Sequence, residues 1–463
     1  MKKRLSITIT LAIALLLAAC GGCAPDAFSV DNTKPVSLEN RIIYQMNIGA
    51  FTPEGTFKAA QGQLARLDTL GVDILWLMPI YPRGATMHSP YAVMDYKAVN
   101  PSYGTVADVK EFVKAAHELG MKVWLDWVPN HAAVENPWVK EHPENFTRDA
   151  KGQMIHPHGW GDVFELNYQE KGLVDAMNDA LHFWISECDV DGFRCDYVSS
   201  PTIPVAYWQN IIADLKSQGK IIEMLSETDI SNSNNQRIDS CGFDYDYAWD
   251  FQSDLAYHFG SEGTQADSLK AICEKFLKAS QAIKNRRMVY LTNHDQNFND
   301  GGHTLKDFYG DNRYLLTVLE FTFYGMPLIY NGQEIGDPDT LNYFTDSKVK
   351  WNQVDVKMKD LVRVLAALHH TQSDLAADAP VEFLATDNPQ VLAYRRGAVV
   401  VVLNLGTEEA QVKMTGMEGG KYAKWLDSKT ILHGPSVTTV DYDGASPIAL
   451  EAKGFEVYSC TVA

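Results

Sequence analysis

The sequence has no excess of positive charge and few cysteines. Its 40 lysines and arginines are outnumbered by 59 aspartates and glutamates, which gives a formal net charge of −19. Nucleic acids are bound by basic patches, so no nucleic-acid partner is expected. The five cysteines from Cys188 to Cys460 contain no C-x-x-C spacing of the kind that holds zinc. Several of them lie in apolar runs, where a buried thiol is the plain expectation.

The sequence also has no apolar run long enough for a comfortable membrane span. The apolar stretch Leu5–Leu17 is short and follows a positively charged start, which is typical of an exported leader. The leader ends in Leu-Ala-Ala-Cys, which resembles a bacterial lipoprotein box. Residues 1–19 are therefore predicted to be a signal peptide, Cys20 to carry a lipid, and residues 20–36 to form a tether. This predicts an exported protein anchored to a bacterial membrane, on its periplasmic or cell-surface side; an ordinary signal peptide is the alternative.

No glycine-rich phosphate loop follows the first apolar run, and we find no internal repeat or low-complexity tract. What the chain does have is a regular alternation of eight short apolar runs with helical patterns. The runs are Arg41–Met46, Val72–Pro79, Lys122–Val128, Val190–Val198, Lys220–Glu227, Phe243–Phe251, Arg287–Asn293 and Met326–Asn331. Near-continuous apolar strands indicate a parallel sheet, and eight alternations predict a (β/α)8 TIM barrel. An open doubly wound sheet is the rival, which the missing glycine-rich loop disfavours.

Two stretches interrupt the alternation and divide the chain into domains. The segment 131–168, after the third run, is long, polar and aromatic and is predicted to be an insertion. After about Ser373 the helical pattern gives way to short apolar strands with polar turns, which predict an antiparallel β-sandwich. The predicted domains are thus a barrel over residues 37–372, which includes the insertion, and a C-terminal sandwich over residues 373–463.

The helical segment after the second run carries clear end signals. Between Thr105 and Gly120, apolar residues recur at helical spacing. Thr105 and Asp108 form a capping-box pattern at the start, and Gly120 provides a stop. The sequence therefore predicts a helix over this segment.

The fourth run contains two charges inside an apolar strand. Side chains two residues apart point to the same face of a strand. Arg194 and Asp196 should therefore share one face, and Phe193, Cys195 and Tyr197 the other. Because an unpaired buried charge is costly, this pair is either a structural ion pair or part of an active site. Gly192 is expected where another backbone approaches closely, with a strand bulge as the alternative.

Polar side chains recur at the ends of several runs, where a barrel of this kind places its active residues. The third run ends DWVPNH, the fourth contains GFRCD, the fifth ends SETD and the seventh is followed by NHDQ. A single Asp or His at a strand end is weak evidence for an active site, since such a residue often caps the next helix. Hits at several ends of one barrel are much less expected by chance.

These segments resemble the conserved regions of the α-amylase superfamily, glycoside hydrolase family 13. The order and spacing fit, and the resemblance covers the barrel, the insertion (the family's domain B) and the C-terminal sandwich. It implies a retaining glycosidase that acts on α-glucosidic bonds of starch-like glucans or maltooligosaccharides. By the resemblance, Asp196 would be the nucleophile, Glu227 the general acid/base and Asp295 the third carboxylate, which stabilises the transition state.

The resemblance also implies substrate-binding residues. His131 and His294 would hydrogen-bond the hydroxyls of the cleaved sugar, Tyr91 would stack under its ring, and Arg194 would hold Asp196 ionised. Asp126 would support the arginine. A nearby arginine is expected to lower the pKa of Asp196, and crowding by Asp196 and Asp295 to raise that of Glu227. Five loop aromatics are candidate sugar platforms, although packing is the likelier role of each: Tyr81, Tyr103, Trp138, Trp160 and Tyr168.

The chain departs from the family where a lysine and a histidine usually follow the nucleophile. Ser199 and Ser200 stand there, and the histidine normally supplies a backbone ligand to calcium. Asn130 matches another calcium ligand, but no partner in the insertion is recognisable, so the usual calcium site looks incomplete and no cofactor is expected to be required. The same change leaves open α-1,4 or α-1,6 hydrolysis and transglycosylation. A non-catalytic glucan-binding protein is a further alternative, which the three carboxylates argue against.

Overall fold

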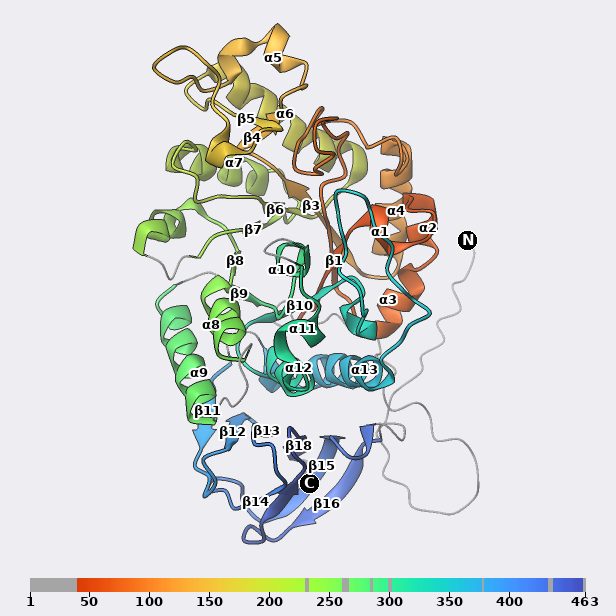
Figure 1. Cartoon of the computed structure of the whole chain (residues 1–463), viewed down its shortest axis with the longest axis vertical. Coiled ribbons are helices and arrows are strands. Elements are labelled where there is room, and N and C mark those ends of the chain that lie inside the picture. The colour runs from red at the N-terminus through yellow and green to blue at the C-terminus, as the bar shows by residue number, and fades with distance from the viewer. Residues whose placement is uncertain are drawn as a thin grey trace, which may run out of the picture.

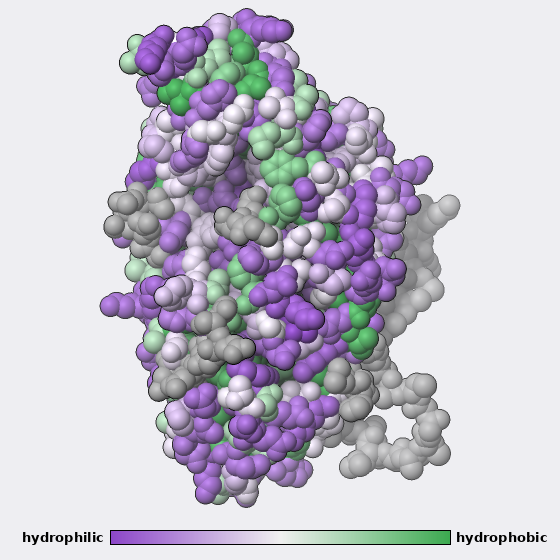
Figure 2. Space-filling model, viewed as in Figure 1, coloured by the Kyte–Doolittle hydropathy of each residue, from purple (hydrophilic) through white to green (hydrophobic). Residues whose placement is uncertain are grey.

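The structure is a computed structural model that describes residues 40–229, 233–259, 266–283, 286–298, 302–376, 379–431 and 436–460. The predicted signal peptide, the lipid on Cys20 and the tether lie outside these residues and stay predictions. In Figure 1 the insertion lies at one end of the molecule and the C-terminal sheets at the other, with the barrel between them. The face shown in Figure 2 is mostly hydrophilic, with smaller apolar patches.

The central unit is a closed barrel of eight parallel strands, as the sequence predicts. Around the barrel the order is β1, β10, β9, β8, β7, β6, β3 and β2, and all neighbours pair in parallel. The strands are β1 (Ile43–Met46), β2 (Ile74–Leu77), β3 (Lys122–Trp127), β6 (Gly192–Cys195), β7 (Glu223–Ser226), β8 (Tyr245–Tyr247), β9 (Arg286–Val289) and β10 (Met326–Tyr330).

Helices connect the strands, and most of the longer ones cover the outside of the barrel (Figure 1). They are α1 (Ile48–Phe51), α2 (Phe57–Gln61), α3 (Leu64–Leu70), α4 (Val106–Glu118), α5 (Trp138–Glu141), α6 (Lys171–Cys188), α7 (Val205–Ser217), α8 (Trp249–Phe259), α9 (Ala266–Gln281), α10 (His294–Phe298), α11 (Leu305–Tyr309), α12 (Asn312–Thr322) and α13 (Val356–Thr371). Helix α4 has the predicted capping box between Thr105 and Asp108. Within the described ranges, no helix combines the length and apolar character that a membrane crossing requires.

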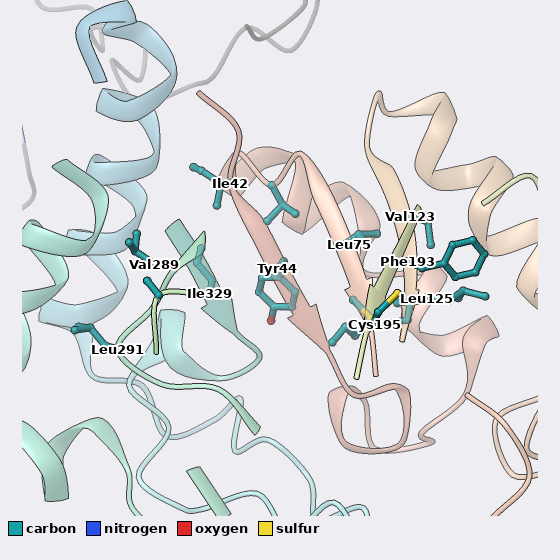
Figure 3. Close-up of a cluster of buried hydrophobic side chains, with 14 of the residues drawn as sticks. Ile42, Tyr44, Leu75, Val123, Leu125, Phe193, Cys195, Val289, Leu291 and Ile329 are labelled. Carbon is teal, nitrogen blue, oxygen red and sulfur yellow. The ribbon is translucent and has the colours of Figure 1, made fainter. Parts of the chain in front are cut away.

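Alternation along the strands divides the core into two layers. Residues such as Tyr44, Leu75 and Phe193 pack between the barrel and the helices (Figure 3). Ile43, Trp76 and their counterparts on other strands fill the barrel interior. On β6, Phe193 and Cys195 lie in the outer layer, as the strand pattern predicts. A Cβ on Gly192 would lie 2.2 Å from the carbonyl oxygen of Glu223, which confirms the predicted close approach.

All eight apolar runs extend beyond the strands they contain, as three of them illustrate. The run Val190–Val198 pairs only as far as Cys195, and Tyr197 adopts a left-handed backbone conformation with φ of 43°. The prediction that Tyr197 shares the outer face with Phe193 is therefore wrong, since the chain turns before it. The run Lys220–Glu227 is a strand only over Glu223–Ser226. The run Phe243–Phe251 ends as a strand at Tyr247, because helix α8 begins at Trp249.

The insertion after β3 is small and largely irregular. Two short antiparallel strands, β4 (His131–Ala133) and β5 (Val163–Glu165), tie its two ends together. Between them lie α5 and two short 3-10 turns, Pro143–Asn145 and Pro157–Gly159. The pairing of β4 with β5 fixes the insertion over the barrel opening beside β6.

The C-terminal region forms antiparallel sheets, as predicted. A six-stranded sheet has the order β11 (Glu382–Leu384), β12 (Val391–Arg396), β13 (Val399–Asn404), β18 (Phe455–Cys460), β15 (Gly420–Asp427) and β16 (Thr438–Tyr442), and β14 (Ala410–Val412) pairs with β17 (Ile448–Leu450). The predicted boundary at residues 372–373 falls just after α13. The buried Arg396 joins the sheet to the barrel by donating to the carbonyl of Phe323 at the end of α12, and it also donates to the carbonyls of Leu375 (3.4 Å) and Ala379 (3.0 Å).

Candidate active site

A cleft of about 950 Å³ opens at the carboxyl ends of the barrel strands, beneath the insertion. Six of the residues singled out from the sequence line it: Tyr91, His131, Asp196, Glu227, His294 and Asp295. The seventh, Arg194, lies under the cleft floor with a fully buried side chain. The structure thus brings together side chains from β2, β3, β6, β7 and β9 that are far apart in the sequence.

Arg194 is the centre of the site because its guanidinium contacts three carboxylates. Nη1 donates to Oδ1 of Asp126 at 3.0 Å and to Oδ1 of Asp196 at 2.9 Å. Nη2 lies 2.5 Å from Oε1 of Glu227, and Nε donates to the hydroxyl of Tyr247 at 3.0 Å. A planar guanidinium has donors in fixed directions. Arg194 therefore holds Asp196 and Glu227 next to each other at the base of the cleft.

The backbone fixes the same two carboxylates. The amide of Asp196 donates to the carbonyl of Trp127 at 2.8 Å, and that of Glu227 to the carbonyl of Cys195 at 3.0 Å. The amide of Tyr197 donates to Oε2 of Glu227 at 2.8 Å. This last bond depends on the turn that follows Cys195.

Burial dominates the protonation of both carboxylates. Burial raises the pKa of Asp196 to about 6, against the opposing effect of Arg194. Arg194 lowers this pKa, as predicted, but burial outweighs the arginine and the net shift is upward. Burial, with Asp196 and Asp295 adding to it, raises the pKa of Glu227 to about 8, in the predicted direction. Between pH 6 and 8 the favoured state therefore has an ionised Asp196 beside a protonated Glu227.

Asp126 supports the arginine from below. Its side chain is fully buried, and it accepts hydrogen bonds from Nε1 of Trp76 (3.1 Å) and the hydroxyl of Tyr91 (3.2 Å) in addition to Arg194. Burial raises its pKa to about 7. Asp126 therefore contacts other side chains of the site and does not face the open cleft.

Tyr91 and His294 form the wall of the cleft between β2 and β9. Their rings stack with centroids 5.3 Å apart, and the Tyr91 hydroxyl lies 2.6 Å from Nε2 of His294. Burial lowers the pKa of His294 to about 4, so its ring is neutral at neutral pH. Gln45 Nε2 faces Nδ1 at 2.7 Å. Asp295 Oδ1 lies 3.5 Å from Nε2 of the same histidine, which places the third carboxylate on this wall.

His131 approaches the cleft from the start of the insertion. Burial lowers its pKa to about 4, so it too is neutral. Its Nδ1 lies 3.1 Å from Nδ2 of Asn130, and its ring makes an edge contact with Trp160, with centroids 5.4 Å apart. Two neutral imidazoles thus face the cleft, and neutral imidazoles can both donate to and accept from sugar hydroxyls.

Of the five loop aromatics named as sugar platforms, one lines the cleft. Trp160 is 45% exposed, whereas Tyr81, Tyr103 and Tyr168 are buried and Trp138 stacks on Tyr96. Several cleft-lining aromatics were not identified from the sequence: Tyr197, Trp249, Tyr343 and Phe344. Tyr197 had a usable signal, since it directly follows the aspartate. Tyr343 and Phe344 lie in a long loop without a motif, and the sequence gives no sign of them.

The residues that match the family's usual calcium site are Asn130 and Ser200. Asn130 is buried and its Oδ1 has no hydrogen-bond partner among the described residues. The carbonyl of Ser200, however, accepts from Nη2 of Arg237 at 2.7 Å, and that of Ser199 at 2.8 Å. In the parts of the chain that the structure covers, no three His, Cys, Asp or Glu side chains gather to hold a metal. A positively charged side chain takes the carbonyls that a cation would need.

Comparison with known proteins gives a consistent family. The model of the alpha amylase catalytic domain matches residues 25–164 and 160–379. The alpha-amylase MalA of Haloarcula japonica is 28% identical over 417 residues, which is 83% of this chain and 58% of that protein. An alpha-1,4-glucan:maltose-1-phosphate maltosyltransferase of Arcanobacterium haemolyticum is 29% identical over 221 residues, 42% of this chain and 31% of that protein.

A solved structure is similar over nearly the whole chain. The noncanonic maltogenic alpha-amylase AmyB from Thermotoga neapolitana superposes with a TM-score of 0.76 at 28% identity, and the match covers 92% of this chain and 100% of that one. The likeness to AmyB therefore extends to the barrel, the insertion and the C-terminal sheets. By contrast, the chain spans little more than half the length of MalA.

Proposed function

Since this chain belongs to the α-amylase family and is a glycosidase, we propose that it hydrolyses α-glucosidic bonds of starch-like glucans or maltooligosaccharides with retention of configuration. One observation carries the proposal: a single guanidinium holds Asp196 and Glu227 side by side, and burial raises the pKa of Glu227 above that of Asp196. Retaining glycosidases use a close pair of carboxyl groups, one ionised and one protonated.

In the proposed reaction each group has one step. Glu227 donates its proton to the glycosidic oxygen while the Asp196 carboxylate attacks the anomeric carbon and forms a glycosyl ester. Water then gives its proton to Glu227, its oxygen bonds to the anomeric carbon, and Asp196 leaves as a carboxylate. The sugar that becomes attached to Asp196 is bound by Asp295, His294 and Tyr91. Arg194 does not react; it positions both carboxylates.

The experiment is digestion of maltotetraose and starch by the full chain, followed by proton NMR and product sizing. We expect shorter maltooligosaccharides whose new reducing ends are first released as the α-anomer. Digestion of pullulan in parallel distinguishes α-1,4 from α-1,6 cleavage. First release of the β-anomer, or no cleavage of any of these glucans, would contradict the proposal.

Transfer to a second sugar is the alternative outcome of the same chemistry. A sugar hydroxyl can replace water in the second step, and one relative matched over the catalytic region is named as a maltosyltransferase. Products longer than the substrate at high maltotetraose concentration would favour transfer over hydrolysis.

We further propose that catalysis does not require calcium, because Arg237 binds the Ser199 and Ser200 carbonyls. EDTA should leave both kcat/KM and the unfolding temperature unchanged. Arg237→Met should lower the free energy of unfolding by about 2 kcal/mol, since charged hydrogen bonds to carbonyls are lost, and added calcium should not restore it. Arg148→Met, which removes an exposed arginine bound to one carbonyl, is the control. A fall in unfolding temperature with EDTA that calcium reverses would show that the proposal is wrong.

A further inference from the structure

Three aromatic side chains form a continuous surface on the side of the cleft next to the insertion. The rings of His158 and Trp160 have centroids 4.8 Å apart, and those of His158 and Tyr197 are 5.2 Å apart. The Tyr197 hydroxyl lies 2.9 Å from Nε2 of His158 and links the barrel to the insertion. All three residues line the cleft. We call His158, Trp160 and Tyr197 the aromatic clamp.

Two features indicate that the clamp is arranged for a ligand rather than for packing. Trp160 is 45% exposed, and Cβ atoms built on its neighbours Gly159 and Gly161 would meet no described atom within 4 Å. The backbones of His158 and Tyr197 both adopt left-handed φ values, 52° and 43°. Such conformations are costly for residues other than glycine and cluster at functional sites. Here the two strained residues meet each other.

The contact between Tyr197 and Glu227 shows which part of a substrate the clamp faces. The Tyr197 amide donates to Oε2 of Glu227, the group that protonates the glycosidic oxygen. Tyr197 follows β6, which pairs with β7, the strand that precedes Glu227, whereas His294 and Asp295 follow β9, two strands beyond β7. The clamp is therefore on the side of the departing sugar, and the second group is on the side of the sugar that becomes bound to Asp196.

We propose that the aromatic clamp binds the sugar ring that departs when an α-glucosidic bond is cleaved, a proposal that rests on the glycosidase function above. The faces of sugar rings are apolar and stack on aromatic side chains. Ser199, which stands where the family usually has a lysine, lines the same cleft and offers no ring to a sugar. The clamp supplies an aromatic contact on this side, by stacking on Trp160 with His158 held in place by Tyr197.

Two substrates that differ only in the departing group test the proposal. Maltotetraose releases a sugar, whereas α-maltosyl fluoride releases a fluoride ion that has no ring to stack. Trp160→Ala should lower kcat/KM about tenfold on maltotetraose, as expected for the loss of one stacked ring. The loss in kcat/KM on α-maltosyl fluoride should be at least fivefold smaller than the loss on maltotetraose. Tyr197→Phe, which keeps the ring but loses the bond to His158, should show the same selectivity with a smaller loss.

Tyr257→Ala is the matched control, because Tyr257 is 80% exposed on α8 and does not line the cleft. It should change neither kcat/KM value. Equal losses on both substrates in Trp160→Ala, or no loss on maltotetraose, would overturn the proposal.

If the wild-type chain cleaves neither substrate, the glycosidase proposal fails, and calorimetric binding still tests the clamp. Trp160→Ala should then bind maltotetraose about tenfold more weakly than the wild type. Unchanged binding would overturn the clamp as well.

Discussion

Glu227→Gln is expected to lower kcat on maltotetraose by about 10³-fold, since a positioned acid contributes about 10²–10⁴ to such a step. The amide cannot donate a proton to the departing sugar oxygen. Fluoride leaves without protonation, so the same variant should still react with α-maltosyl fluoride in a first rapid phase. The second step needs a base and should then stall. Burst kinetics of fluoride release measure both effects.

Asp196→Asn is the matched comparison for this variant. It lacks the nucleophile and should show no burst with either substrate. Unchanged unfolding temperatures would show that both variants fold. If Glu227→Gln keeps more than a few per cent of wild-type activity on maltotetraose, Glu227 is not the acid. If Asp196→Asn shows a burst, Asp196 is not the nucleophile.

Arg194→Met is expected to have the second largest effect. It leaves Asp126, Asp196 and Glu227 buried without their shared cation, and breaking such a contact costs about 3–5 kcal/mol of unfolding free energy. Because the positive charge opposes protonation, its loss should raise the pKa of Asp196 above about 6. At neutral pH the nucleophile is then mostly protonated, and kcat/KM should fall by about 10²-fold or more.

The pH profile separates this positioning role from a merely structural one. In the wild type, kcat/KM should fall below pH 6 as Asp196 is protonated, and above pH 8 as Glu227 loses its proton. In Arg194→Met the fall of kcat/KM on the acidic side, the lower limb of the pH profile, should move to higher pH. Arg194→Lys keeps the charge without the planar donors and should restore part of the lower limb. A variant with the wild-type lower limb would contradict the assignment.

The barrel could be predicted from the sequence because its signals are local. Buried parallel strands have continuous apolar runs, and Thr105 with Asp108 marks a helix start within a few residues. The runs misplace strand ends, because apolar side chains continue into the next element. Trp249 is apolar and follows β8, yet it begins a helix. Pairing with neighbouring strands ends β6 at Cys195, and that depends on distant parts of the chain.

In the site, too, features with local signals could be predicted, and features that depend on distant residues could not. The candidate carboxylates could be identified at strand ends, because a barrel gathers those ends on one face. The direction of the Asp196 pKa could not, because it depends on burial and on Asp126 and Glu227 sharing Arg194. The turn at Tyr197 could not be predicted either, since tyrosine rarely adopts a left-handed conformation. The aromatic clamp follows from that turn and so becomes visible only in the structure.

Mass spectrometry of Glu227→Gln after incubation with α-maltosyl fluoride shows which residue forms the bond to the sugar. The expected product is a protein heavier by one maltosyl group, with the added mass on the peptide that contains Asp196. An adduct on another residue, or release of fluoride over many turnovers without any adduct, would contradict the claim that Asp196 is the nucleophile of a retaining glycosidase.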